Sequence, residues 1–183
     1  MRPRDFIKIA AKDYKKVGSI TVSSKYTVKK VVSYLKPEYK YIVEYGAGGG
    51  TTTKKILDHI SADGKVVAIE LNRDLLSELG KIKDPRLIIL NEDVTVVTEK
   101  LTSLGLPRID AVVSNIPMSF IKKSDRKRVM ENTFNAIAKG GRFIVYQYSL
   151  MALPLLKSFF KNTSYYLEIR NLPPYFIMVG EKD

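Results

Sequence analysis

The sequence predicts one α/β domain in which helices cover both faces of a mainly parallel β-sheet. From residue 41 onward, short apolar segments alternate with segments of helical periodicity, which is typical of successive βα units. Two further β-rich segments follow one another near the C-terminus, as expected for an antiparallel pair. The length of 183 residues suits a single core, so we expect one domain over residues 1–183.

The expected strands are short apolar segments that end at turn-forming residues. The alternating part of the chain supplies strands at residues 41–45, 65–70, 87–90, 109–114 and 142–146. The last two strands, at residues 164–170 and 175–179, are separated by a turn that contains Pro173 and Pro174. Together they predict a mixed sheet of seven strands in which the last strand is antiparallel.

The expected helices carry apolar residues three or four positions apart. They lie at residues 26–35, 51–60, 73–80, 95–104, 124–138 and 150–160. Before them, residues 4–17 place apolar side chains on one face and lysines on the opposite face, which predicts a basic amphipathic helix. We therefore expect residues 1–36 to form a basic helical segment of the domain, which Pro37 ends.

The composition excludes several classes of function. The chain has no cysteine and a single histidine, His59, which excludes thiolate catalysis, disulfide scaffolds and zinc fingers, and we expect no metal. Its start lacks the apolar core of a signal peptide, and Gln147 and Lys157 interrupt the most apolar stretch. We expect a cytoplasmic protein that is soluble or peripheral at the inner face of the membrane.

The positive charge is concentrated in two segments. The net charge is +12; residues 1–40 hold eleven Lys or Arg against three acidic residues, and residues 119–128 hold five against one. Clustered cations attract polyanions, so the partners expected are an anionic membrane surface or a nucleic-acid backbone. Solubility alone is the other interpretation of this charge.

A glycine-rich turn directly after the first expected strand is the most informative segment. Residues 44–51 read Glu-Tyr-Gly-Ala-Gly-Gly-Gly-Thr. Glycines let a ligand approach the main chain, and the start of the following helix offers free N–H groups. Thr51 stands where a dinucleotide fingerprint requires its last glycine, and no Gly-Lys-Ser/Thr ends the turn as in a P-loop. The segment therefore predicts a small-molecule site, and its departures from both motifs argue against NAD and against a nucleoside triphosphate as the ligand.

The spacing of Glu44 and the glycines after it resembles motif I of Rossmann-like S-adenosylmethionine-dependent methyltransferases. The resemblance continues in order through the chain, with Glu70 after the second strand, residues 91–94 after the third and residues 114–117 after the fourth. It implies a three-layer αβα sandwich, S-adenosyl-L-methionine as the cofactor and S-adenosyl-L-homocysteine as its product. It also implies that residues 1–36 cover the cleft for cofactor and substrate.

The same resemblance implies a set of residues that bind the cofactor. The set comprises Glu44, Gly46, Ala47, Gly48, Gly50, Glu70, Leu71, Asp93, Val94 and Asn115. Within it, Glu70 is expected to accept hydrogen bonds from the ribose hydroxyls and Asp93 from the adenine amino group. Helix capping is the structural alternative for Glu70, and a solvated loop acid is the alternative for Asp93.

The loop after the fourth strand is where the family places the transferred methyl group. The residues expected to serve catalysis are Asn115, Ile116, Pro117 and Tyr148. An asparagine beside a turn held by proline can orient an amine nitrogen without protonating it. Methyl transfer then requires positioning and electrostatics but no metal and no covalent enzyme intermediate. A purely structural turn is the alternative.

The acceptor is the point on which two resemblances differ. Residues 115–117 resemble the catalytic motif of the rRNA adenine dimethyltransferases. In those enzymes an aromatic residue that stacks on the base follows this motif, but here Met118 stands in its place. This difference counts against an adenine substrate unless Phe120 takes over the stacking. The resemblance along nearly the whole chain is to bacterial phospholipid N-methyltransferases. It rests on the basic start and on residues 17–24, 113–117, 140–148 and 171–174.

The expected function is therefore methylation of a head-group amine of the phosphatidylethanolamine type at a membrane surface, by a monomer. The expected substrate-binding residues are Ser23, Ser24, Tyr26, Met118, Phe120, Lys122 and Lys123. Adenine-N6 methylation of RNA, methylation of a small amine and cofactor binding without catalysis are the alternatives.

Overall fold

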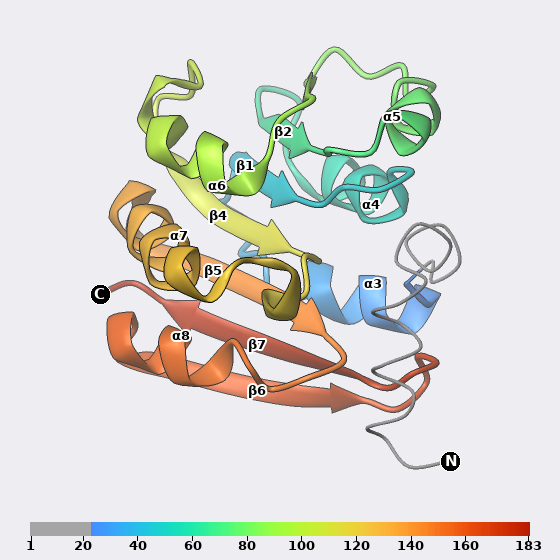
Figure 1. Cartoon of the computed structure of the whole chain (residues 1–183). Coiled ribbons are helices and arrows are strands. Elements are labelled where there is room, and N and C mark those ends of the chain that lie inside the picture. The colour runs from blue at the N-terminus through green and yellow to red at the C-terminus, as the bar shows by residue number, and fades with distance from the viewer. Residues whose placement is uncertain (1–22) are drawn as a thin grey trace.

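A single mixed sheet forms the centre of the molecule (Figure 1). The computed structural model describes residues 23–183, and the helix expected at residues 4–17 lies outside the described residues. The strands are β1 (Tyr41–Tyr45), β2 (Lys65–Ile69), β3 (Leu87–Leu90), β4 (Ile109–Ser114), β5 (Ile137–Gln147), β6 (Asn162–Glu168) and β7 (Tyr175–Glu181). Their order is β3-β2-β1-β4-β5-β7-β6, and β7 runs antiparallel to both of its neighbours. The expected α/β class, with seven strands and an antiparallel last strand, is confirmed.

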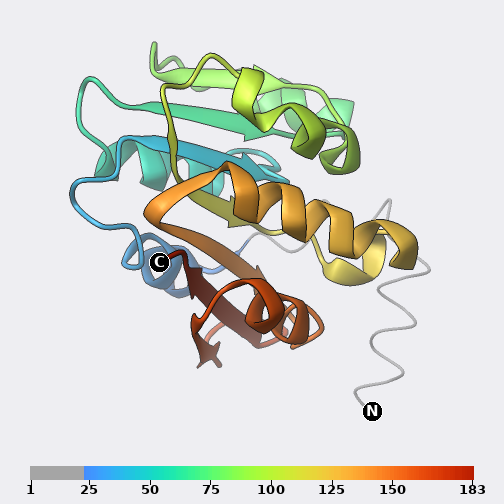
Figure 2. The same ribbon diagram turned by 90° about the vertical axis from the view of Figure 1, so that its left-hand side faces the viewer.

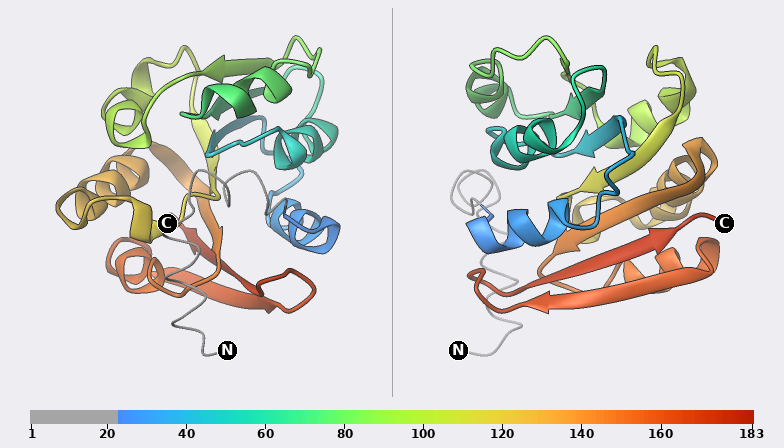
Figure 3. Two further views of the ribbon diagram at one scale, coloured as in Figure 1. Left: turned by 45° about the vertical axis from the view of Figure 1, so that its right-hand side comes forward. Right: turned by 180° about the vertical axis from the view of Figure 1, so that it is seen from behind.

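Helices cover both faces of this sheet. The first face carries α3 (Lys25–Val32), α4 (Thr51–His59) and α5 (Arg73–Leu79), and the second carries α6 (Val94–Val97), the 3₁₀ helix η1 (Thr98–Ser103), α7 (Lys123–Ala136) and α8 (Leu153–Phe159). Figures 2 and 3 show these two helical layers from further sides. Alternate residues of the strands point to opposite layers, so Ile42 packs towards α3 and α4 and Val43 towards α6, α7 and α8. Strands buried on both faces explain the nearly continuous apolar segments of the sequence.

Most element boundaries differ from the expectation by one to three residues, and three elements differ in a way that has a structural cause. The expected helix at residues 95–104 is present but divided: α6 has four residues, and the 3₁₀ helix η1 follows with a non-helical Lys100. Three of the four residues of α6 are valines, which have low helix propensity. The last helix begins at Leu153, where Pro154 occupies its first turn. Strand β5 begins at Ile137 because Gly140, with φ +76°, allows an irregular pairing with β4.

The carboxyl ends of the parallel strands meet at one edge, where the site of an open α/β sheet is expected. In Figure 1 the arrowheads of β4, β5 and β6 all point to this edge, which lies on the right. The start of α3 is fixed to the same edge, because Ser24 N and the Thr27 hydroxyl donate to Asn171 Oδ1 at 2.8 and 2.9 Å. Asn171 belongs to the turn between β6 and β7. Among residues 23–183, no helix has the length and apolar character needed to cross a bilayer.

We expect Asn171→Ala to lower the free energy of unfolding by about 2–3 kcal/mol, because it leaves Ser24 N and the buried Thr27 hydroxyl without their acceptor. Chemical denaturation measures this loss. Asn135→Ala is the matched control, since Asn135 lies on the exposed side of α7, and its effect should stay within about 0.5 kcal/mol. Equal stability of the two variants would contradict the anchoring role of Asn171.

Candidate functional site

The glycine turn after β1 is packed on one side and open on the other. Gly46, Gly48 and Gly50 have φ values of +71°, +57° and +87°, which non-glycine residues rarely adopt. A Cβ at Gly46 would lie 2.8 Å from Ile116 Cγ1, whereas a Cβ at Gly48 would meet nothing within 4 Å. The turn is held in place because Gly46 N and Ala47 N both donate to the carbonyl of Ile69. The open side at Gly48 fits a small molecule that approaches the main chain.

Glu70 lies immediately beside this turn at the end of β2. Its Oε2 accepts from Gly48 N and its Oε1 from Asn72 N, both at 2.8 Å. The side chain of Asn72, not that of Glu70, caps α5 by accepting from Asp74 N. These two main-chain donors fix the orientation of the Glu70 carboxylate. Because a carboxylate oxygen can accept more than one hydrogen bond, both oxygens can still accept from a ligand at the edge of the sheet.

Asp93 has a structural role that the sequence did not specify. It caps α6, since its Oδ1 accepts from Thr95 N at 2.7 Å and from the Thr95 hydroxyl at 2.6 Å. No hydrogen bond joins its Oδ2 to the described residues, so that oxygen is the one through which the expected adenine contact could form. The neighbouring Glu92 forms an ion pair with Lys100. Leu71 is exposed and Val94 is buried.

Glu44 lies beneath the turn and is fully buried. Its Oε2 accepts from the Thr53 hydroxyl at 2.6 Å, but its Oε1 has no hydrogen-bond partner among the described residues. Burial raises the pKa of Glu44 from 4.5 to about 8, and the charge of Glu70 acts in the same direction. A buried carboxyl oxygen without a partner is rare in a folded protein; with the raised pKa it can carry the proton and either donate to or accept from a bound group.

The loop after β4 joins the glycine turn through the main chain. Asn115 N donates to the carbonyl of Tyr45 at 3.0 Å, so the pairing of β1 and β4 continues into both loops. Pro117 O accepts from Phe120 N in the 3₁₀ turn η2 (Met118–Phe120). The side-chain amide of Asn115 makes no hydrogen bond within residues 23–183. It is therefore available to a ligand between the two loops.

The residues expected to bind the substrate around this loop differ in exposure. Met118 is buried, and its N–H donates to Gln147 Oε1 at 2.8 Å. Its side chain lines a small apolar cavity together with Ile116 and other core residues. Phe120 is 39% exposed, and the Tyr148 hydroxyl forms a hydrogen bond with Ser119 Oγ at 3.0 Å. Phe120 thus lies at the surface and Tyr148 is half-buried against the core, whereas Met118 belongs to the core.

The remaining expected substrate residues come from the start of α3 and of α7. Ser24 caps α3 and Ser23 is buried. The Tyr26 ring has the Arg170 guanidinium carbon 4.4 Å from its centre, which is within cation–π range. Lys122 and Lys123 are exposed and form no ion pair with the described residues. These residues share the edge of the sheet, but no hydrogen bond or ion pair among the described residues joins the start of α3 to Lys122 or Lys123.

Sequence reasoning missed a buried polar layer beneath the site. Thr53 supports Glu44, and the Thr52 hydroxyl forms a 2.9 Å hydrogen bond with the Tyr146 hydroxyl. Burial raises the pKa of Tyr146 well above its usual range, so it is a neutral hydrogen-bonding group. The available signals were a run of three threonines directly after the glycine turn and a polar residue, Gln147, at the end of an apolar strand.

Comparison with known proteins agrees with this geometry. A family model described as a methyltransferase domain matches residues 42–141. The ornithine lipid N-methyltransferase of Singulisphaera acidiphila is 26% identical over 178 residues, which cover 93% of each chain. The ribosomal RNA small subunit methyltransferase H of Christiangramia forsetii is 29% identical over 102 residues, which cover 56% of this chain but 33% of that protein.

Solved structures share the same fold. The N-methyltransferase NodS of Bradyrhizobium japonicum, solved with S-adenosyl-L-homocysteine, superimposes with a TM-score of 0.68 at 8% identity and covers 86% of both chains. The precorrin-6y C5,15-methyltransferase of Geobacter metallireducens has a TM-score of 0.67 at 13% identity and covers 89% of this chain and 91% of that one. The chain belongs to the family of methyltransferase domains and is a Rossmann-like, S-adenosylmethionine-dependent methyltransferase.

Proposed function

We propose that this methyltransferase transfers a methyl group to the amine nitrogen of a lipid head group at a membrane surface. The observation that carries the proposal is the similarity to an ornithine lipid N-methyltransferase along 93% of both chains. A match of this extent covers nearly all of both chains, whereas the match to the ribosomal RNA relative covers 56% of this chain. The net charge of +12 favours an anionic surface.

RNA methylation is the second candidate. It is favoured by the similarity to ribosomal RNA methyltransferases and by the basic residues 122–128. The chain spans about one third of the length of those relatives, however. In the loop that follows Asn115, Met118 is buried and is not aromatic, so it cannot stack on a base. The aromatic ring of this loop is that of Phe120, which is partly exposed.

In the proposed reaction, the described residues bind and orient the two reactants. When bound, S-adenosylmethionine supplies an electrophilic methyl group on a sulfonium sulfur. The Glu70 carboxylate accepts hydrogen bonds from the ribose hydroxyls, and the free oxygen of Asp93 accepts from the adenine amino group. Gly48 leaves room for the cofactor against the main chain. Binding at this edge brings the cofactor beside the loop that holds Asn115.

Asn115 orients the acceptor amine in this proposal. Its side-chain oxygen accepts a hydrogen bond from an amine N–H and leaves the nitrogen lone pair free to attack. Because an amide is neutral, it does not favour the ammonium form, whereas a carboxylate at the same place would. Glu44 is fully buried and accepts from Thr53 of α4, so we give it no role in removing the proton of the amine.

A labelling experiment tests the acceptor class. The full chain is incubated with S-adenosylmethionine that carries a labelled methyl group, in parallel with vesicles containing phosphatidylethanolamine, vesicles containing ornithine lipid, and total RNA. We expect label in an amino lipid and none in RNA. Label in RNA alone would overturn the lipid proposal.

The Glu70 assignment predicts a specific loss of cofactor affinity. Glu70→Ala removes two charge-assisted acceptor positions and should weaken binding of S-adenosylhomocysteine by about tenfold or more, as measured by calorimetry. Glu70→Gln should lose less because one acceptor oxygen remains. The control Glu78→Ala removes an exposed acid of α5 that pairs with Lys81 and should leave the affinity unchanged. If Glu70→Ala binds as tightly as the wild type, the ribose assignment is wrong.

The Asn115 assignment predicts a shifted pH profile. Asn115→Asp keeps the shape of the side chain, but its carboxylate should raise the pKa of the bound amine by about one unit or more. At neutral pH the reactive neutral amine then falls about tenfold, and kcat should fall with it. Activity should recover as the pH rises above the pKa of the amine. A pH–kcat profile parallel to that of the wild type would contradict contact between Asn115 and the amine.

A further inference from the structure

Five exposed apolar side chains gather at the edge of the sheet that carries the site. We call Phe120, Leu150, Met151, Ile169 and Leu172 the apolar rim. Their exposed fractions are 39%, 37%, 44%, 71% and 89%, which is unusual for large apolar side chains grouped in one region. Leu172 and Ile169 are the two most exposed large apolar residues of the part described.

The topology brings these residues together from three distant parts of the sequence. Phe120 follows the end of β4, Leu150 and Met151 follow the end of β5, and the other two lie between the end of β6 and the start of β7. Strands β4, β5 and β6 run in the same direction, with β7 antiparallel between β5 and β6. All three loops therefore lie at the same edge of the sheet.

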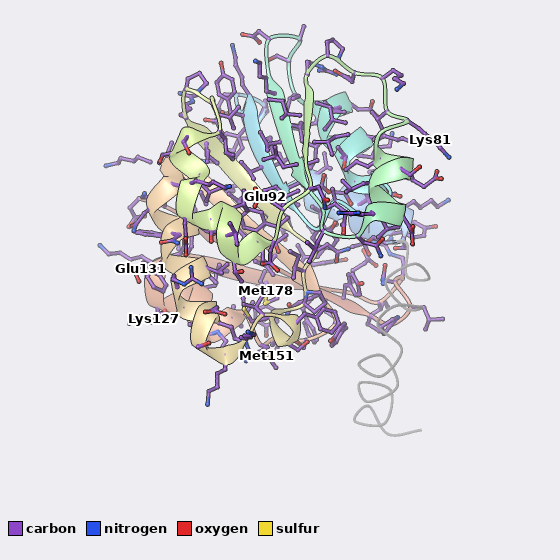
Figure 4. All side chains as sticks on the ribbon, turned by 45° about the horizontal axis from the view of Figure 1, so that its top comes forward. Lys81, Glu92, Lys127, Glu131, Met151 and Met178 are labelled. Atoms are coloured by element: carbon purple, nitrogen blue, oxygen red, sulfur yellow. The ribbon has the colours of Figure 1, made fainter. Side chains whose placement is uncertain are left out.

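Charge divides this edge into two halves. The three segments around the apolar rim, at residues 118–124, 148–161 and 169–176, contain no acidic residue. They include Lys122 and Lys123, which form no ion pair with other described residues. After β2 and β3, by contrast, residues 70–74 and 91–94 contain four acidic residues and one arginine. Of these acids, Glu70 is buried and Glu92 pairs with Lys100, so within the part described Asp74 and Asp93 carry the unpaired negative charge of this half. Figure 4 shows Met151 and Glu92 over these different halves of the sheet.

We propose that the apolar rim and the lysines beside it dock on an anionic lipid bilayer, with the acidic half of the edge facing water. Apolar side chains gain free energy by entering the acyl boundary, and neighbouring lysines gain it from anionic head groups. RNA rewards the lysines alone, because its phosphate backbone offers nothing to Ile169 or Leu172. This inference rests on the proposed lipid acceptor and adds the surface and the orientation by which the enzyme meets it.

The chain has no cysteine, so single introduced cysteines can report this orientation in the full-length protein. Leu172→Cys on the rim and Asp74→Cys on the acidic half are each labelled with a dye whose emission depends on polarity. On addition of vesicles of phosphatidylcholine and phosphatidylglycerol, the emission at position 172 should shift to the blue and that at position 74 should not. A shift at both positions, or at neither, overturns the proposed orientation.

Vesicle sedimentation tests the contribution of the rim to binding. Ile169→Ser combined with Leu172→Ser should lower partitioning onto the same vesicles by about tenfold. The matched control Val96→Ser changes an apolar residue of α6 that is 46% exposed and lies outside the rim, and it should bind as the wild type does. Unchanged partitioning of the double variant, or a loss of RNA binding without a loss of vesicle binding, overturns the proposal.

The docking surface and the lipid acceptor can fail separately. Cofactor affinity, measured by calorimetry, should be the same in the double variant and the wild type, which shows that the site is still folded. If the wild type binds vesicles through the rim but transfers no label to any amino lipid, the acceptor proposal fails and the docking surface stands. If label enters lipid although the double variant partitions normally, the docking surface fails.

Discussion

The contact between Gly46 and Ile116 is the constraint on which the site depends. Gly46 has a φ of +71° and no side chain, so Ile116 can pack directly against it. A Cβ at position 46 would lie 2.8 Å from Ile116 Cγ1. Any larger residue would push the loop after β4 away from the turn after β1. The main-chain bond from Asn115 N to Tyr45 O requires the same close approach. The cofactor loop and the loop that carries Asn115 therefore form one continuous surface.

The polar groups beneath that surface have a cost in stability that a purely structural core would avoid. Glu44 is fully buried with one oxygen unpartnered among the described residues, and burial raises its pKa to about 8. Desolvating a carboxyl in this way is unfavourable unless it is compensated. Thr53 compensates one oxygen only. The remaining acceptor is best explained by a ligand or water bound above it, as at other functional sites where local stability is sacrificed.

The sequence predicted the parallel core and its loops better than the elements around them. Strands β1, β3 and β4 have the expected bounds. In β1 and β4 the apolar segments end where burial on both faces ends, and the half-buried edge strand β3 is bounded by polar residues on either side. The helix expected at residues 95–104 is divided into α6 and a 3₁₀ helix, because periodicity does not reveal where a valine-rich α-helical turn changes to a 3₁₀ helix. The anchoring of α3 by Asn171 was equally hidden, since the contact from Asn171 to Ser24 joins distant parts of the chain.

The same limit explains why the site could be predicted only in part. Glu70 and Asn115 follow strands directly, so parallel topology alone brings them to one edge. The apolar rim comes from three loops, and each contributes one or two apolar residues that look unremarkable in sequence. Only the order β4-β5-β7-β6 gathers them beside one another.

The division of the edge has a consequence for an enzyme whose two substrates differ in polarity. A lipid amine remains in the bilayer, whereas S-adenosylmethionine and its product exchange with water. An edge that was apolar and basic throughout would bury the cofactor entrance against the membrane, and the product could leave only after the protein dissociated. With Asp74 and Asp93 in the segments after β2 and β3, which carry no lysine cluster like that beside the rim, anionic lipid favours the rim half and leaves the other half in water. In the proposed orientation the cofactor can therefore be exchanged while the acceptor side stays docked.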